Sequence, residues 1–549
     1  MDKAMNMGKT SATGSFQLLI GVVGSNIIMA LGTLVLAALL SRDQLGLYSV
    51  AIVPSSMISF FRDWGVNSAL TKEIAQRRAT EQEDEIHGLI VSGVIFEVIS
   101  GALCSLICFA LAGLLAAFLK MPDATALISI SSIYIFAGAI SAAAGGIFVG
   151  FERMKLNSLT TILSALVKTA IGPLLVVLGY GTMGAAVAYV MYGVVGGGVG
   201  IALVYFALYR PLHKLNLGRR DVFETLKPML SFGIPLTLSN IMIGVLPLLF
   251  IFIMASIAGA SLMGDFAAGV YFNVLLTFFV IPISTALFPT FAKVNPQKEP
   301  ELLKTVFASA TKYASVLIVP ATILIMALSN PMVNTLWPNK FPNAPLFLTL
   351  YATVNLFVAI GTISVGALMT GLGQTRRLLL QSSLSLAFCA PIVAFLFFNG
   401  SALSPLTGMI TGIFGIVLSG SSLPGLIWGL TWVWKKYQVK VDLLGAVKIF
   451  AASGAAALVT LLFLMFFNPS PMTRTIAIIQ LVVGFFLFLL IYVVAAPLAG
   501  AVNIIDISNM RAMSSSLGIV SKVLELPLKI MEKILKLRGK ARPNTQTKA

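Results

Sequence analysis

Five charged residues interrupt long apolar runs of this sequence, and they are the residues with the most chemical potential: Arg62, Asp63, Glu97, Lys168 and Lys312. An ionisable group in mid-bilayer costs on the order of 2.5–3.5 kcal/mol on insertion scales, so such groups face other protein groups or water. A cation in this position can bind an anion, and arginine can hold phosphate oxygens in a bidentate way. A carboxylate can carry a proton or a sodium ion. The pattern indicates an internal polar site.

The composition predicts that the apolar runs cross a membrane. Of 549 residues, 58% are hydrophobic and only 10% are charged, whereas soluble domains carry about 25% charged residues. A bilayer core of ~30 Å needs about 20 apolar residues per helix. Open sheets cannot span lipid, because their edges leave backbone groups unpaired. We therefore expect an all-α, polytopic integral membrane protein.

About fourteen apolar segments reach membrane-spanning length. Their expected bounds are 16–40, 46–70, 87–118, 125–149, 157–179, 182–208, 229–256, 264–291, 305–328, 345–370, 378–397, 406–434, 443–467 and 473–498. The three cysteines, Cys104, Cys108 and Cys389, lie inside these runs and are expected to be small packing residues. With two histidines in the whole chain and no metal-ligand spacing, we expect no metal and no cofactor.

Lysine and arginine in the loops predict the orientation. If the amino terminus is cytoplasmic, the outside loops hold only Arg42, Lys120, Lys340 and Arg474, and all other loop cations lie inside. The net charge of +17 is then a sign of topology rather than of nucleic-acid binding. Both termini are expected in the cytoplasm.

After the last apolar run, residues 517–537 read LGIVSKVLELPLKIMEKILKL. Apolar residues recur there at helical spacing and lysines occupy the other side, so we expect an amphipathic helix on the cytoplasmic membrane surface. The tail beyond Arg538 is short and polar, and is expected to be disordered.

An internal repeat divides the apolar segments into two sets of six. Four short stretches recur in the same order at offsets of roughly 214 to 221 residues, which indicates parallel repeats related by an axis along the membrane normal. The pairs are SNII (25–28) with SNIM (239–242), LGLYSVA (45–51) with MGDFAAG (263–269), SALTKEIAQ (68–76) with TALFPTFAK (285–293), and GFERMKLNSL (150–159) with GLGQTRRLLL (371–380). The expected parts are an amino-terminal lobe at 1–210, a cytoplasmic linker at 211–228, a second lobe at 229–434, two extra spans at 443–498, and a cytoplasmic amphipathic helix and tail at 505–549.

The twice-six-plus-two arrangement resembles the MOP transporter superfamily, which contains the MATE drug exporters and the Wzx-type polysaccharide or oligosaccharide flippases. The stretch DWGVNSALTKEIAQ at 63–76 resembles the flippase motif at the end of the second span, and GLGQTRRLLL resembles the flippase loop before span 11. The resemblance covers almost the whole chain. It implies two pseudo-symmetric six-helix lobes, and a cleft lined partly by spans 1, 2, 7 and 8 that often contains cations.

That resemblance implies roles for individual residues. Arg62 fits the cleft best as a substrate contact, followed by Lys168 and Lys312, and Asn26 and Asn240 occupy equivalent places in the two halves. The asparagines are either polar groups of the cleft or interhelical hydrogen-bonding groups.

Two interpretations remain open for the carboxylates of Asp63 and Glu97. Glu97 pairs either with Lys168 or with Arg62 as a buried salt bridge, or else Asp63 or Glu97 carries a coupling H⁺ or Na⁺. Neighbours on one continuous helix point about 100° apart, so Arg62 and Asp63 are not expected to face each other.

The expected function is that of a flippase, which moves lipid-linked oligosaccharide or polysaccharide repeat units from the cytoplasmic to the outer leaflet by alternating access. The alternative is a cation-coupled multidrug or metabolite exporter of MATE type. A membrane enzyme is disfavoured, because the outside loop at 329–344 contains no His, Asp or Glu. Expected partners are membrane lipids, a polyprenyl-(di)phosphate-linked glycan, a coupling H⁺ or Na⁺ and glycan-assembly enzymes, in the cell membrane of a prokaryote.

Overall fold

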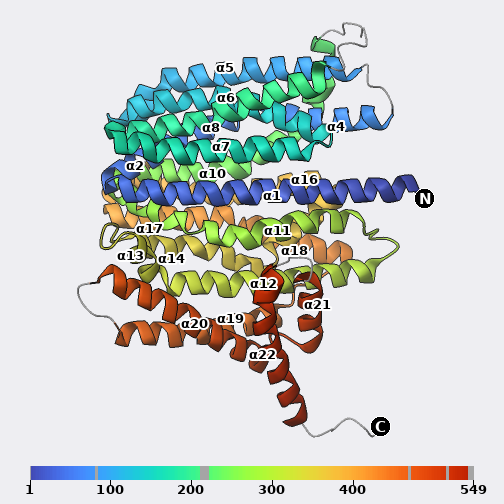
Figure 1. Ribbon diagram of the computed structural model, residues 1–549, viewed down its shortest axis with the longest axis vertical. Coiled ribbons are helices and arrows are strands. Elements are labelled where there is room, and N and C mark those ends of the chain that lie inside the picture. The colour runs from blue at the N-terminus through green and yellow to red at the C-terminus, as the bar shows by residue number, and fades with distance from the viewer. Residues whose placement is uncertain (1, 81–84, 211–221, 468–471, 515–518, 542–549) are drawn as a thin grey trace. The chain divides into compact units, whose positions relative to one another are not determined.

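The computed structural model describes residues 2–80, 85–210, 222–467, 472–514 and 519–541 (Figure 1). The described residues form helices joined by short turns, with no strand among them. This confirms the all-α class. The helices are α1 (Asp2–Leu39), α2 (Arg42–Ala51), α3 (Val53–Ser59), α4 (Val66–Ala79), α5 (Ile86–Leu119), α6 (Ala124–Gly150), α7 (Met154–Leu175), η2 (Val176–Tyr180), α8 (Gly181–Val204), η3 (Tyr205–Tyr209), α10 (Val222–Tyr271), α11 (Val274–Ala292), α12 (Pro300–Ala327), α13 (Ser329–Leu336), α14 (Ala344–Ala352), η4 (Thr353–Ile360), α15 (Thr362–Gly371), α16 (Thr375–Asn399), η5 (Gly400–Ala402), α17 (Pro405–Gly420), α18 (Leu423–Tyr437), α19 (Leu443–Phe466), α20 (Arg474–Ala499), α21 (Ile504–Ser514) and α22 (Ile519–Ala541).

Length and hydropathy identify 10 helical segments of the described chain as able to cross a membrane, or 11 with the bent pair Ala344–Ile360 and Thr362–Gly371. Two of the segments are too long to be one span each. A straight helix of 56 residues, as at Met154–Tyr209, would be about 84 Å long, against a bilayer core of ~30 Å. Gly179 and Gly181, both at positive φ, break this segment, and Gly259 at φ 75° breaks α10. The two breaks fall where the sequence predicts boundaries between spans.

The second predicted span is not one continuous helix. It consists of α2, α3 and α4, with a non-helical break between α3 and α4 in which Trp64 (φ 46°) and Gly65 (φ 76°) are left-handed. The expectation that Arg62 and Asp63 lie on one continuous helix is therefore wrong, since both residues stand in the break.

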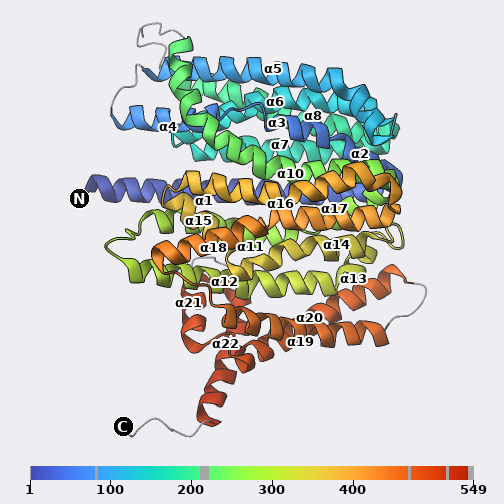
Figure 2. The ribbon, with the colours of Figure 1, turned by 180° about the vertical axis from the view of Figure 1, so that it is seen from behind.

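The described chain forms two compact units, and the first contains residues 1–274 and 382–420. Its helices α5, α6, α7 and α8 run side by side in Figures 1 and 2. Glycines of α8 let α6 approach closely: a Cβ at Gly197 would lie 2.8 Å from the Ala137 carbonyl oxygen, and one at Gly200 would lie 2.8 Å from the Ala144 Cβ. The glycine-rich stretch at 193–200 therefore serves helix packing.

The helix α2 meets α10 within the same unit through a reciprocal backbone contact. A Cβ at Gly46 would lie 1.7 Å from the Ala260 carbonyl oxygen, and one at Gly264 would lie 2.1 Å from the Arg42 carbonyl oxygen. The contacts join residue 46 to residue 260 and residue 42 to residue 264. Residues 42 and 260 are 218 positions apart in the sequence, and so are residues 46 and 264, so each contact joins one position to the repeat equivalent of the other. This exchange of equivalent positions is what a pseudo-two-fold axis between repeats produces.

A bidentate ion pair reinforces the contact between α2 and α10. Arg42 donates from Nε and from an Nη to the two carboxylate oxygens of Asp265, each over 2.6 Å. The Asp265 side chain is fully buried and that of Arg42 is 31% exposed. Because the carboxylate is out of water, loss of Arg42 would leave it as an uncompensated buried charge. The ion pair therefore ties the two helices together.

The second compact unit contains residues 275–381 and 421–549. Within it, α19 and α20 pack beside each other and against α12, around Ile449, Ala456 and Phe488. These two helices are the predicted spans 13 and 14. The compact units do not coincide with the predicted lobes, because α10 packs with the amino-terminal helices in this conformation. The lobe division follows the sequence repeat and stays a prediction, and its linker lies largely outside the described residues.

The carboxy-terminal amphipathic segment forms α22, as the spacing predicts. Its Leu528 and Met531 are buried against the core of the second unit. Arg511 of α21 donates to Glu525 (3.2 Å) and Glu532 (3.0 Å) of α22, which joins the two helices. Part of the apolar face thus packs on protein, while Leu526 and Leu537 stay exposed.

Candidate functional site

The break between α3 and α4 places two charges inside the first unit. Gly65 lies directly against the backbone of α10: a Cβ there would be 2.3 Å from the Gly233 Cα. Backbone N–H and C=O groups of a broken span are tolerated at membrane depth only where protein or a water-filled cavity surrounds them. The chain uses this interruption to position Arg62 and Asp63.

Arg62 forms the cationic half of a buried polar network with α5 and α4. Its Nε lies 3.5 Å from the Glu97 Oε2, and an Nη donates to the Ile135 carbonyl oxygen over 3.3 Å. Asn67 donates from Nδ2 to the Glu97 Oε1 over 2.9 Å. The Glu97 side chain is fully buried and that of Arg62 is 12% exposed. Of the two pairings that the sequence left open for Glu97, the structure has the one with Arg62.

Asp63 caps the start of α4. Its Oδ1 accepts a hydrogen bond from the backbone N–H of Asn67 over 3.0 Å. Among the described residues, the Arg62 Nε, the Glu97 Oε2 and the Asn67 Oδ1 are buried without a hydrogen-bond partner. The Arg62 Nε and the Glu97 Oε2 face each other over 3.5 Å as an ion pair without a hydrogen bond.

Lys168 lies apart from this network, against aromatic rings. Its Nζ is 5.5 Å from the ring centroid of Tyr189 and 5.9 Å from that of Tyr192. The ring centroid of Tyr134, on α6, lies 4.3 Å from that of Tyr189 and 6.4 Å from that of Tyr192. We call Tyr134, Tyr189 and Tyr192 the tyrosine cluster. Within the part of the chain that the structure describes, no carboxylate is in ion-pair distance of Lys168, and the predicted pair with Glu97 is absent.

The tyrosine cluster connects the two cations. A Cβ at Gly138 would lie 3.2 Å from an Nη of Arg62 and 3.6 Å from the Tyr134 Cζ, so the guanidinium and that ring border the same small space. Tyr189 also shares a hydrogen bond with Ser56 of α3, 3.3 Å between the hydroxyl oxygens. Arg62 and Lys168 are thus joined by aromatic rings and hydroxyls, groups suited to an anion that carries polar and ring-shaped parts. Sequence reasoning missed the three tyrosines, although Tyr189 and Tyr192 stand one helical turn apart on the span that follows Lys168.

The remaining predicted site residues lie elsewhere. Lys312 donates to the Asp506 Oδ2 over 2.6 Å, inside the second unit. Asp506 also caps α21 with Asn503, each backbone N–H donating to the other side chain over 2.8 Å. Lys312 therefore anchors α21. Asn26 is half-buried on α1 and Asn240 is exposed on α10, and neither side chain is hydrogen-bonded to Arg62.

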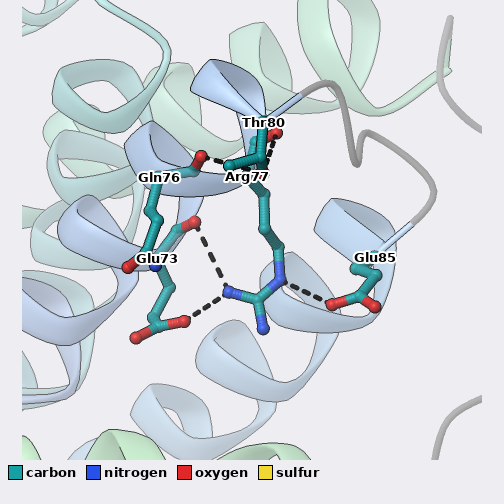
Figure 3. Close-up of polar contacts among 5 residues, drawn as sticks. All are labelled: Glu73, Gln76, Arg77, Thr80 and Glu85. Atoms are coloured by element: carbon teal, nitrogen blue, oxygen red, sulfur yellow. Dashed lines mark hydrogen bonds and ion pairs between the residues drawn. The ribbon is translucent and has the colours of Figure 1, made fainter.

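The motif at 63–76 ends in a second charged cluster, shown in Figure 3. Arg77 donates to the carboxylates of Glu73 and Glu85, the latter over 2.9 Å. Burial by itself lowers the pKa of the Arg77 guanidinium, but the hydrogen bonds to Glu73 and Glu85 outweigh burial and raise that pKa above its ordinary value. Because Glu85 directly precedes α5, this cluster fixes the end of α4 to the start of α5. This charged cluster is structural.

Replacing Gly65 by alanine tests whether the break is needed. The left-handed backbone alone costs roughly 1–2 kcal/mol for a residue with a Cβ, and that Cβ would meet the Gly233 backbone. We expect the purified Gly65→Ala protein to melt at a lower temperature and to lose transport. Gly113→Ala is the control, because a Cβ at Gly113 meets nothing within 4 Å. Equal melting temperatures and transport rates for both variants would contradict the role of the break.

Comparison with solved structures defines the fold. The chain is similar to the structure titled "Lipid II flippase MurJ, inward closed conformation", with a TM-score of 0.66 and 14% identity over 87% of this chain and 98% of that one. It is also similar to an inward-facing multidrug resistance MATE family transporter of the MOP superfamily, with a TM-score of 0.59 and 17% identity over 75% of this chain and 95% of that one. The chain has the fold of these multi-pass membrane transporters.

The family follows from the sequence match. Residues 11–295 match the family model described as polysaccharide biosynthesis protein. The match covers more than half of the chain, and the chain belongs to this family. The lipopolysaccharide biosynthesis protein WzxC of Escherichia coli (strain K12) is 25% identical over 363 residues, 63% of this chain and 68% of that protein. This confirms the expected relation to polysaccharide biosynthesis proteins at the level of the family.

Proposed function

We propose that this protein is a flippase that carries lipid-linked oligosaccharide or polysaccharide repeat units from the cytoplasmic to the outer leaflet by alternating access. The observation that carries the proposal is the family match over residues 11–295, because this range contains the break, the charged network and the tyrosine cluster. WzxC, a relative by sequence, is a lipopolysaccharide biosynthesis protein, and MurJ, a neighbour by fold, is a lipid II flippase. The protein acts as a transporter and not as an enzyme.

Arg62 and Lys168 bind the phosphate or diphosphate of the lipid-linked glycan in this proposal. An anion crosses the membrane at lower cost if fixed cations replace part of its hydration shell. Arg62 can offer its planar fork once its attraction to Glu97 is weakened, and Lys168 is free of carboxylates among the described residues. The hydroxyls and rings of the tyrosine cluster supply hydrogen bonds and stacking for the sugar next to the phosphate. Lys312 is left out of this role because Asp506 pairs with it.

Glu97 or Asp63 carries the proton or sodium ion that couples transport. Neutralising the Glu97 carboxylate would weaken its attraction to the Arg62 guanidinium 3.5 Å away and release the cation for substrate. The network thereby links occupancy of a cation site with availability of an anion site. Asn26 and Asn240 contribute polar groups to the cleft as the two lobes move.

The orientation follows from the lysines and arginines of the loops. Both termini, α22 and the loop at 371–374 lie on the cytoplasmic side of a prokaryotic cell membrane. Enzymes that assemble the glycan work on the same side and are the expected protein partners.

A leaflet assay tests this function. In cells depleted of the protein, an impermeant glycan-binding reagent should detect less lipid-linked glycan on the outer leaflet, and the wild-type gene should restore it. Lys168→Gln should restore the signal at a rate at least about 10-fold lower, since a hydrogen bond to a charged group contributes about 1.5–3 kcal/mol. Lys155→Gln is the matched control, an exposed lysine on the same helix α7.

The MATE-type alternative gives a different result. An unchanged leaflet distribution after depletion, together with efflux of an organic cation driven by an ion gradient, would replace the flippase by an exporter. Equal rescue by Lys168→Gln and Lys155→Gln would remove Lys168 from the substrate site and leave the flippase function standing.

A further inference from the structure

An open groove of about 830 Å³ lies in the second unit. It lies at the ends of the helices whose connecting loops carry most of the lysines and arginines. It is formed by three segments: the loop after α11, the loop between α15 and α16, and the end of α18. Its volume falls in the range of small-molecule sites. The residues around it are Lys293, Val294, Asn295, Pro296, Gln297, Gly371, Leu372, Gln374, Lys436 and Tyr437.

Buried residues and loop hydrogen bonds hold the first segment of the groove in place. Val294 is 8% exposed and belongs to a buried cluster with Phe291 and Phe307. The Asn295 Oδ1 accepts hydrogen bonds from the backbone N–H groups of Gln297 (3.0 Å) and Lys298 (3.3 Å), which shapes the first loop. Such Asx turns hold a loop in one conformation.

The second loop, part of GLGQTRRLLL, ends α15 with a left-handed Gly373 at φ 68°. The Gln374 backbone N–H donates to the Met369 carbonyl oxygen over 2.8 Å, and the Gly373 N–H to that of Thr370 over 3.1 Å. This is the hydrogen-bond pattern of a Schellman cap. It fixes Gln374 at the groove, so the glycine serves the shape of this loop.

Trp432 of α18 joins the second loop to the third segment. The Arg377 guanidinium lies 5.6 Å from the centroid of the Trp432 ring, and the Lys436 Nζ lies 5.1 Å from that centroid. The Lys436 Nζ is also 5.3 Å from the ring centroid of Tyr437. These cation–π contacts orient Lys436, which lines the groove, and place Arg377 against the same Trp432 ring.

Both charged residues that line the groove are cations, and the Glu299 carboxylate, at the start of α12, accepts a hydrogen bond from the Asn295 backbone N–H over 3.5 Å. Two lysines and no carboxylate line the groove. Lys293, Lys436 and Arg377 form no ion pair with any described residue. A groove lined by one sign of charge concentrates counter-ions. The amides of Asn295, Gln297 and Gln374 and the Tyr437 ring supply the hydrogen bonds and the flat apolar surface that sugars need.

We propose that this groove is a docking site for the phosphate-linked sugar of a lipid-linked glycan, which it captures at the cytoplasmic surface before the substrate enters the transport cleft. The lysines bind phosphate or diphosphate oxygens, and the amides with Tyr437 bind the adjoining sugar. A purely anionic surface ligand would need neither the amides nor the ring. The identity of this ligand rests on the proposed flippase function, whereas the binding of a phosphate anion does not.

Lysine footprinting tests the site on the full-length protein. Nanodiscs of phosphatidylcholine are prepared alone, with undecaprenyl diphosphate, or with phosphatidylglycerol of equal total charge, and soluble inorganic diphosphate is added in a fourth arm. An amine-reactive label and mass spectrometry then report each lysine separately. Lys298 and Lys435 are internal controls, because they are exposed near Lys293 and Lys436 in the sequence and do not line the groove.

Undecaprenyl diphosphate should slow labelling of Lys293 and Lys436 at least about 3-fold relative to Lys298 and Lys435, while phosphatidylglycerol should not. Equal protection of all four lysines, or equal protection by phosphatidylglycerol, would overturn the site in favour of a general anionic membrane contact. Protection by soluble diphosphate alone would overturn the lipid source and identify a free phosphate ligand. Unchanged labelling in every arm would remove the site.

A transport assay connects the groove to function. The Lys293→Gln/Lys436→Gln double variant should raise the apparent KM for lipid-linked glycan about 10-fold, by weakening charge-assisted hydrogen bonds, and leave the maximal rate unchanged. Lys298→Gln/Lys435→Gln removes the same charge and should behave as wild type. Equal behaviour of the two doubles would overturn the docking role. If wild type itself moves no glycan, the proposed function fails, and the footprint still decides whether the groove binds phosphate.

Discussion

Replacing Arg62 by alanine is expected to abolish transport and to destabilise the protein. The Glu97 carboxylate is fully buried, and without the guanidinium it would depend on the hydrogen bond from the Asn67 amide. Breaking one half of a buried ion pair costs about 3–5 kcal/mol. The thermal midpoint of the purified protein and the leaflet assay measure the two effects. Arg62→Lys should recover stability in part, because it keeps the charge and loses the planar fork.

A double variant in which residues 62 and 97 are both neutral distinguishes a loss of substrate binding from a loss of stability. In the Arg62→Met/Glu97→Gln double variant both charges of the pair are gone, and the carbonyl of the new glutamine side chain can still accept from Asn67, so we expect near wild-type stability. If Arg62 binds the substrate phosphate, this folded double variant is still inactive. Full transport by the double variant would show instead that the Arg62–Glu97 pair only holds the first unit together.

Breaking the Arg42–Asp265 ion pair is expected to have the second large effect. Asp265 is fully buried and receives two hydrogen bonds of 2.6 Å from Arg42, so Arg42→Gln should cost about 3–5 kcal/mol. The predicted lobes place Arg42 in the first lobe and Asp265 in the second, at the outer ends of their spans. If the two lobes separate there during transport, the variant should also open more often at this end. Hydrogen–deuterium exchange should then rise in α2 and in residues 260–271, and not in α6.

Two further variants distinguish an Arg42–Asp265 contact that opens during transport from one that stays closed throughout the cycle. Asp43→Asn is the control, since this exposed carboxylate neighbours Arg42 and should leave stability and exchange unchanged. Arg42→Gln/Asp265→Asn removes both charges and should regain part of the stability while exchange stays high. Stability loss without any local rise in exchange would mean that α2 and α10 stay together throughout the cycle.

The apolar pattern predicted most of the fold, because membrane insertion depends on the local hydrophobicity of about 20 residues. The helices α5, α6, α12, α19 and α20 begin and end within a few residues of the predicted spans. The spacing of the repeats also predicted which positions would be equivalent. Gly46 and Gly264, equivalent by that spacing, each make a close backbone contact between α2 and α10, and the division into repeats stays a prediction. The sequence equally marked Arg62, Asp63, Glu97 and Lys168 as unusual, since a charge in an apolar run is visible without any structure.

The partner of each charge was decided only by the tertiary structure. Glu97 could reach Arg62 or Lys168 as far as the sequence is concerned. The left-handed Trp64 and Gly65 interrupt the second span, and this break leaves Arg62, and not Lys168, beside Glu97. Lys312, which looked like Lys168 from its position in an apolar run, is neutralised by Asp506, 194 residues away. Depth in the membrane is a local property that the chain encodes directly, whereas an ion pair depends on how helices distant in sequence rotate and break.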